Sequence, residues 1–233
     1  MLRPTQRIKQ PHILLGMGRH LVYSEGTKTE PFYVQSFKNE LEKNRKNKGD
    51  RAQIIFKHFR ESKHTVDLVK RAESDVALRL ARGEHIDAVW LFFDRDSFDD
   101  FDDAYQRIVR KRVPSHSNAH GMGGDENDIA WVACWSNECF EVWVYLHFED
   151  LSSQLPRKDY IPKINGFIKA RGHKGHYEKN KEELMPFLIE CGGDMKKAIQ
   201  RAKNKIRNIP DDEKRPNPST GVYQFAEFFS AYL

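Results

Sequence analysis

Hydrophobic and polar residues follow two alternating patterns along the chain. Short apolar or alternating runs predict strands, and runs with an apolar residue every three or four positions predict helices. The predicted strands cover residues 19–24, 52–59, 87–93 and 129–135, and the helices between them cover about 31–41, 65–82, 99–112 and 138–148. Because strands and helices alternate, we expect an α/β fold with a mostly parallel sheet flanked by helices.

The pattern changes after residue 150, where strand signals disappear and four polar helices follow. We expect these helices at about residues 161–170, 179–191 and 194–207 and after Pro218. The chain is therefore expected to consist of a basic, flexible N-terminal tail (1–18), an α/β core (19–150) and a helical C-terminal extension packed on that core (151–233).

Composition narrows the class of protein. No apolar run approaches the roughly 18 residues that a membrane span needs, and the basic N-terminus lacks the apolar segment of a secretory signal. Cys134, Cys139 and Cys191 match no zinc-ligand spacing and are expected to be buried thiols. We therefore expect a cytoplasmic protein that makes no contact with membranes.

Charge is unevenly distributed. The net charge is +5, and basic clusters recur along the chain, whereas acidic residues concentrate between residues 94 and 103. This distribution favours a polyanionic partner such as nucleic acid, although each basic cluster is also explained as the solvated face of a helix.

Carboxylates follow two of the predicted strands. Glu25 comes directly after the first strand, and Asp94 and Asp96 follow the most apolar one, residues 87–93. Ligands of open parallel sheets bind at the carboxyl ends of the strands, and Mg²⁺ is commonly held by one or two carboxylates together with substrate phosphate. The acids at 99–103 need no such role, because acidic residues favour the first turn of a helix.

This order of motifs resembles the Toprim fold of topoisomerases, primases and related nucleases, and most closely the RloB family. The resemblance rests on Glu25-Gly26-Thr27-Lys28-Thr29-Glu30-Pro31, Phe93 to Asp96, Ser136-Asn137-x-Cys139-Phe140-Glu141-x-Trp143, and Asn217-Pro218-Ser219-Thr220. One departure is that Ser97-Phe98 stands where many Toprim proteins have a glycine, so topoisomerase mechanisms do not carry over as a whole.

The resemblance implies a Toprim-like, metal-dependent nuclease that acts on DNA or RNA. Glu25 would serve as general base or metal ligand, and Asp94 and Asp96 would hold Mg²⁺ or Mn²⁺. Members of the family resemble the nuclease halves of antiviral, abortive-infection systems and are often encoded beside an ATPase. The chain itself contains no Gly-x-x-x-x-Gly-Lys-Ser/Thr loop, so any use of ATP would come from that partner.

Glu141 lies on a predicted helix that is apolar around most of its circumference. An isolated buried carboxylate would be costly, so Glu141 is either a fourth acidic metal ligand or the partner of an Arg or Lys.

Six further residues are candidates for contact with the substrate. Lys28 would bind the reacting phosphate, Lys174 and Lys179 would contact phosphates, and Tyr177 would stack on a base or orient water. Asn137 and Thr220 could also face the substrate. Their alternatives are surface lysines for the first three and plain helix caps for Asn137 and Thr220.

The sequence therefore predicts an Mg²⁺-dependent nuclease. The alternatives are a non-catalytic module that binds a nucleotide or a nucleic-acid end at the same acids, and a primase-like nucleotidyltransferase. The choice of DNA or RNA, endo- or exonuclease action, a one- or two-metal mechanism, the activating trigger, the partner and homo-oligomer formation stay open.

Overall fold

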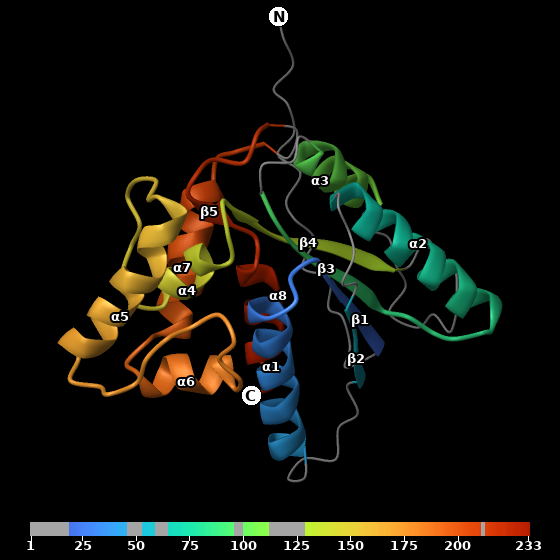
Figure 1. The fold of residues 1–233 in the computed structure, drawn as a ribbon. Helices are drawn as coiled ribbons and strands as arrows, with labels where there is room; N and C mark the ends of the chain where they lie inside the picture. The colour runs from blue at the N-terminus through green and yellow to red at the C-terminus, as the bar shows by residue number, and fades with distance from the viewer. Residues whose placement is uncertain (1–18, 46–52, 59–64, 96–99, 112–128, 211–212) are drawn as a thin grey trace, which may run out of the picture.

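One sheet forms the centre of the molecule (Figure 1). The computed structural model describes residues 19–45, 53–58, 65–95, 100–111, 129–210 and 213–233. Among these residues the sheet has five strands in the order β2-β1-β3-β4-β5. They are β1 (Arg19–Ser24), β2 (Gln53–His58), β3 (Ala88–Asp94), β4 (Ala130–Asn137) and β5 (Ser219–Thr220). The first four are parallel and β5 is antiparallel to β4, which confirms the predicted α/β class.

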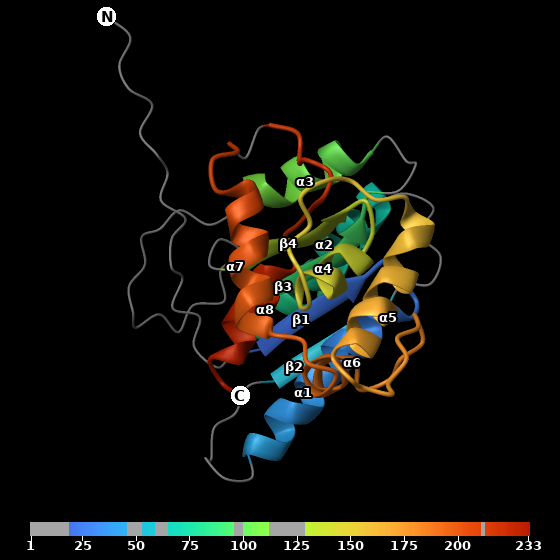
Figure 2. The same ribbon diagram turned by 90° about the vertical axis from the view of Figure 1, so that its left-hand side faces the viewer.

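Helices cover both faces of this sheet. In the described parts of the chain they are α1 (Thr29–Arg45), α2 (Thr65–Ala81), α3 (Phe101–Arg110), α4 (Glu141–Leu146), α5 (Tyr160–Ala170), α6 (Leu184–Glu190), α7 (Met195–Ile206) and α8 (Tyr223–Ser230). The 3-10 turn η2 (Arg157–Asp159) precedes α5. Helices α2 and α3 cover one face and the others gather on the opposite side (Figures 1 and 2). Within the described ranges, no helix has the combination of length and apolar sequence that crossing a membrane requires.

Strand β3 explains why the sheet needs two helical layers. Its alternate side chains belong to two separate hydrophobic clusters: Trp90 and Phe92 pack with α1 and α8, whereas Leu91 and Phe93 pack with α2 and α3. A continuous apolar run is typical of a parallel strand that is buried on both faces. The sequence pattern of residues 87–93 thus corresponds to its position at the centre of the sheet.

The C-terminal part completes the sheet and its core. Ser219 and Thr220 pair with the end of β4 as β5, so the expectation that no strand follows residue 150 is wrong. A strand of two residues is too short to show the alternation on which strand prediction depends. From α8, Phe225 packs against Trp90 and Phe92, with ring centroids 5.4 and 5.2 Å apart.

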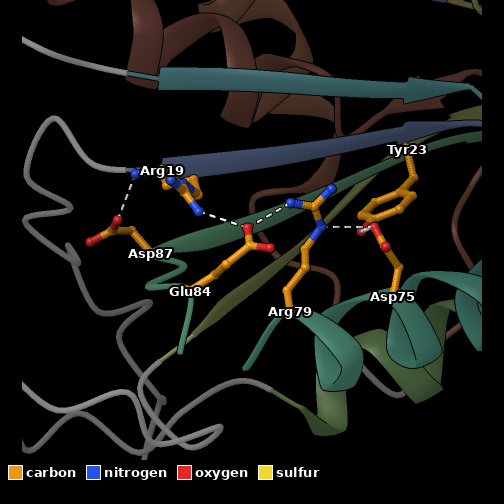
Figure 3. A network of polar contacts seen from close by, with 6 residues as sticks. All are labelled: Arg19, Tyr23, Asp75, Arg79, Glu84 and Asp87. Atoms are coloured by element: carbon orange, nitrogen blue, oxygen red, sulfur yellow. Dashed lines mark hydrogen bonds and ion pairs between the residues drawn. The ribbon is translucent and has the colours of Figure 1, made fainter. Parts of the chain in front are cut away.

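A polar network joins α2 to β1 on the other face (Figure 3). The Tyr23 hydroxyl donates to Asp75 at 2.8 Å, and Arg79 donates to Asp75 at 3.1 Å and to Glu84 at 2.8 Å. Arg19, the first residue of β1, donates to Glu84 at 2.7 Å. Burial, followed by the hydrogen bond to Asp75, raises the pKa of Tyr23 far above its usual range, so Tyr23 stays a donor at neutral pH.

The strand order creates a crevice at one edge of the sheet. The chain leaves β1 toward α1 on one face, and α3, the first described helix after β3, lies on the opposite face. Neighbouring strands whose connections diverge in this way leave an opening beyond their carboxyl ends, where ligands of open α/β sheets bind. Glu25 and Asp94 are at these two strand ends.

Candidate functional site

A pocket with a volume of about 240 Å³ lies at the carboxyl ends of β1 and β3. Its residues come from the loop after β1 and the start of α1, the end of β3, the start of α4, η2 and the segment before α6. They are Glu25, Gly26, Thr27, Lys28, Thr29, Glu30, Asp94, Phe140, Glu141, Arg157 and Lys179. The pocket therefore combines parts of the α/β core with parts of the C-terminal region.

The structure brings Glu25 and Asp94 to the same pocket. The backbone N–H of Glu25 donates to the carbonyl of Phe92 at 3.0 Å, which continues the pairing of β1 with β3 by one residue. The Thr65 hydroxyl, at the start of α2, donates to the Glu25 carboxylate at 3.4 Å. Asp94 ends β3 and its side chain is 15% exposed. The third predicted acid, Asp96, lies outside the described residues.

Glu141 lines the same pocket from the first turn of α4. Its side chain is 3% exposed and its Oε1 lies 3.3 Å from the Lys179 Nζ. The Tyr177 hydroxyl donates to the same oxygen at 3.2 Å. The ion pair expected under one of the two interpretations is therefore present, and Glu141 also faces the pocket, as the other interpretation requires.

Tyr177 has a different environment from the one predicted. Its side chain is fully buried, so the expectation that a base stacks on its ring is wrong. The Asn165 side chain accepts from the Tyr177 N–H at 2.7 Å and donates to the Tyr177 carbonyl at 3.0 Å. These two bonds hold the Tyr177 backbone, and the ring packs in the hydrophobic core instead of facing a substrate.

A second buried glutamate, Glu30, was not among the predicted site residues. It lies in the first turn of α1 and is 7% exposed. Burial, with a further contribution from the charge of Glu141, raises the pKa of Glu30 to about 7. A Cβ at Gly26 would meet Glu30 Oε2 at 2.2 Å. The glycine after Glu25 thus makes room for the Glu30 carboxylate, and this link was not visible in the sequence.

Three basic side chains are among the described residues that line the pocket. Lys179 pairs with Glu141, Arg157 Nη2 lies 3.5 Å from Asp94 Oδ2, and Lys28 is exposed. Arg157 was missed because a lone arginine after a proline, far from either strand end in sequence, carries no local signal. Cations beside a group of carboxylates suit a ligand that contains both metal and phosphate.

The sequence model of one protein family, described as RloB-like protein, matches residues 20–228. The chain belongs to the RloB-like family. No curated protein and no solved structure matches it.

The motifs of this RloB-like protein gather at one end of its sheet. Residues 25–31 follow β1, residues 93–95 end β3, residues 136–143 join β4 to α4, and residues 217–220 include β5. Strand β5 pairs with Ser136 and Asn137 at the end of β4. Motifs that are widely separated in the sequence therefore meet at the end of the sheet where the pocket lies.

Three of the predicted substrate residues do not line the pocket, whose described lining omits Asn137, Lys174 and Thr220. The Asn137 side chain donates to the Arg215 carbonyl at 2.9 Å, and Phe140, not Asn137, precedes the first residue of α4. The Thr220 hydroxyl donates to the Trp135 carbonyl at 2.9 Å. Both side chains are buried and support the end of β4, whereas Lys174 is exposed elsewhere.

The pocket contains side chains of the kind that bind a magnesium ion. Glu25 and Asp94 supply carboxylate oxygens, and Mg²⁺ keeps several waters and needs only one or two such ligands beside a phosphate. Within the part of the chain that the structure describes, which excludes Asp96, no three His, Cys, Asp or Glu side chains come close enough together to hold a metal ion. The metal thus stays a prediction.

Proposed function

We propose that this RloB-like protein is a Mg²⁺- or Mn²⁺-dependent nuclease with a Toprim-type active site that hydrolyses phosphodiester bonds in DNA or RNA. One observation carries the proposal: Glu25 and Asp94, at the ends of two adjacent parallel strands, share a pocket with Lys28, Arg157 and Lys179. Carboxylates suited to a divalent cation and basic groups suited to phosphate then lie within the same small volume.

Each residue has a part in this proposal. Glu25, Asp94 and Asp96 would hold the cation, and Glu25 would also be placed to accept a proton from the attacking water. A bound divalent cation would supply a water of lowered pKa and would stabilise the charge that develops on the phosphate. Lys28, exposed at the rim, would neutralise a further phosphate oxygen.

The biological setting is an extension of the proposal. The resemblance to RloB proteins supports a role in antiviral defence together with an ATPase partner. Any use of ATP would come from that partner, since the sequence of this chain has no phosphate-binding loop of its own. The basic clusters along the chain support a nucleic-acid substrate.

Cleavage assays test the nuclease. Wild type, Asp94→Asn and Asp103→Asn are incubated with single- and double-stranded DNA and with tRNA, in Mg²⁺, Mn²⁺ or EDTA. We expect wild type and Asp103→Asn, whose change lies on an exposed position of α3, to cleave only with a divalent cation. Asp94→Asn should lose cleavage. Cleavage in EDTA, or full cleavage by Asp94→Asn, contradicts the proposal.

A second candidate is a non-catalytic module that binds nucleic-acid ends or nucleotides. The two ion pairs favour it, because Arg157 and Lys179 already lie against Asp94 and Glu141. Binding of the same substrates without cleavage under any of these conditions would support this candidate over the nuclease.

A further inference from the structure

The basic side chains that line the pocket differ in how firmly they are held. Lys179 pairs with Glu141, whose side chain is 3% exposed. A buried carboxylate that loses its cation is left with an uncompensated charge, which is strongly unfavourable. Lys179 is therefore needed beside Glu141 to compensate its charge, and it is poorly suited to leave Glu141 for a ligand.

The ion pair of Arg157 has a less buried carboxylate than that of Lys179. Arg157 Nη2 lies 3.5 Å from Asp94 Oδ2, and the arginine side chain is 43% exposed, whereas the Asp94 side chain is 15% exposed. A guanidinium that is already partly in water loses little when such a pair separates, but the carboxylate then needs another cation in its place. Arg157 can thus leave Asp94 when a different cation takes over the compensation of that carboxylate.

The backbone that carries Arg157 is better fixed than its side chain. Arg157 begins the single turn η2, in which the Asp159 N–H donates to the Pro156 carbonyl at 2.8 Å. Helix α5 begins directly afterwards at Tyr160, which is buried. The guanidinium group therefore moves by side-chain rotation about an anchored backbone and stays within reach of the pocket.

We propose that Arg157 binds the substrate phosphate in this pocket, and that its ion pair with Asp94 is exchanged for that phosphate when a divalent cation binds. A cation at Asp94 would take over the charge that the guanidinium now supplies and would repel the guanidinium. The released group presents parallel N–H donors, which match two phosphate oxygens. This inference rests on the proposed function and adds the residue that couples cation binding to substrate binding.

The first test measures the cation alone. Thermal melts at increasing Mg²⁺ compare wild type with Arg157→Gln and with Lys158→Gln, a neighbouring exposed residue that is absent from the pocket lining. Without the competing guanidinium, Arg157→Gln should reach half of its Mg²⁺-induced shift at up to about fivefold lower Mg²⁺. Lys158→Gln should match wild type. An equal or higher Mg²⁺ requirement in Arg157→Gln overturns the exchange.

The second test measures phosphate binding. Fluorescence anisotropy follows a short labelled single-stranded DNA and its RNA counterpart in Ca²⁺, which takes the same kind of oxygen ligands as Mg²⁺, and in EDTA. We expect Arg157→Gln to bind about tenfold more weakly than wild type in Ca²⁺ and to differ much less in EDTA, where Arg157 is occupied by Asp94. Arg157→Lys keeps the charge without the paired donors, and its affinity in Ca²⁺ should lie between those of wild type and Arg157→Gln.

The outcomes separate this inference from the nuclease itself. A loss that is equal in Ca²⁺ and EDTA, or equal in Lys158→Gln, reflects general surface charge and overturns the role of Arg157, while the cleavage result for Asp94→Asn is unaffected. Conversely, a protein that binds Mg²⁺ and the oligonucleotide as expected but never cleaves supports Arg157 and contradicts the nuclease. A wild type without any Mg²⁺-induced shift contradicts both.

Discussion

Glu30 and Glu141 place two carboxyl groups where water hardly reaches. Both are more than nine-tenths buried, and Lys179 is 3.3 Å from one of them. Natural proteins rarely bury carboxylates in this way unless they are paired or coordinate a cation. The acidic residues of the pocket are therefore expected to control both its stability and its response to metal.

The raised pKa of Glu30 predicts a dependence of stability on pH. Between the ordinary value of 4.5 and about 7 the folded protein keeps a proton that the unfolded chain has lost. Stability must then fall as pH rises through this interval and level off above it. Across this pH interval, the free energy of unfolding of wild type should fall by on the order of 3 kcal/mol relative to that of Glu30→Gln.

Urea denaturation at a series of pH values measures this difference. Glu182→Gln, an exposed position before α6, serves as the control and should follow the wild-type curve. Parallel curves for wild type and Glu30→Gln would show that Glu30 ionises as it does in the unfolded chain.

Replacement of Glu141 separates its two interpretations. In Glu141→Gln, the amide can still accept from Tyr177, and Lys179, which is 46% exposed, regains water. Unfolding free energy should therefore change by no more than about 1 kcal/mol in EDTA, while the Mg²⁺-induced rise in melting temperature should shrink.

Thermal melts with EDTA and with Mg²⁺ decide between the two interpretations of Glu141. The matched control is Tyr177→Phe, which removes one hydrogen bond to Glu141 and leaves the carboxylate in place. If Glu141→Gln loses about 3–5 kcal/mol and keeps its magnesium shift, Glu141 is a structural ion-pair partner only.

Individual site residues were predictable where the backbone alone determines them. Glu25 and Asp94 follow strands, and any parallel pairing of β1 with β3 puts them at one edge. Glu30 and Arg157 were not predictable, because their place depends on side-chain directions and on a contact between distant segments. Tyr177 was misjudged for the same reason, since its burial depends on contacts with residues distant in sequence, such as Glu141.

At the scale of elements, the link between α2 and β1 depends on a few polar groups (Figure 3). Arg79 is 14% exposed and bonds both Asp75 and Glu84. Replacement by methionine keeps much of the aliphatic packing and removes both bonds. We expect Arg79→Met to lower the free energy of unfolding by about 1–3 kcal/mol.

Arg82→Met is the control, because Arg82 is exposed just beyond α2 and its loss should change stability by less than about 0.5 kcal/mol. Chemical denaturation measures the stability of both variants. Equal denaturation midpoints for Arg79→Met and Arg82→Met would show that the network does not contribute to the stability of the fold.

Elements with a regular pattern along their whole length were predicted best. Strand β1 has its predicted bounds, and α2 ends one residue before the predicted limit, because periodicity repeats several times within each. Helix α1 extends beyond the predicted 31–41, running from Thr29 to Arg45, and α4 is shorter than predicted, running from Glu141 to Leu146. Strand β5 depends on its pairing with β4 and has no pattern of its own.

At the scale of the whole molecule, the last helix closes the core over the sheet. Phe225 is fully buried and its ring lies within 5.5 Å of those of Phe37, Trp90 and Phe92. Phe225→Ala should therefore cost about 3–5 kcal/mol of stability. Phe228→Ala, at a partly buried position of the same helix, should cost less, and urea denaturation ranks the two. The reverse ranking would show that α8 covers the sheet less closely.

The hydrogen bond from the Thr29 hydroxyl to the Lys179 carbonyl joins residues 150 positions apart at the wall of the pocket. Translation produces the chain from its N-terminus, so Glu25 and Asp94 leave the ribosome well before Arg157 and Lys179. A nascent or prematurely terminated chain that stops short of these residues has acids at its strand ends but no basic partners opposite them. The order of synthesis thus delays assembly of the site until most of the polypeptide has been made.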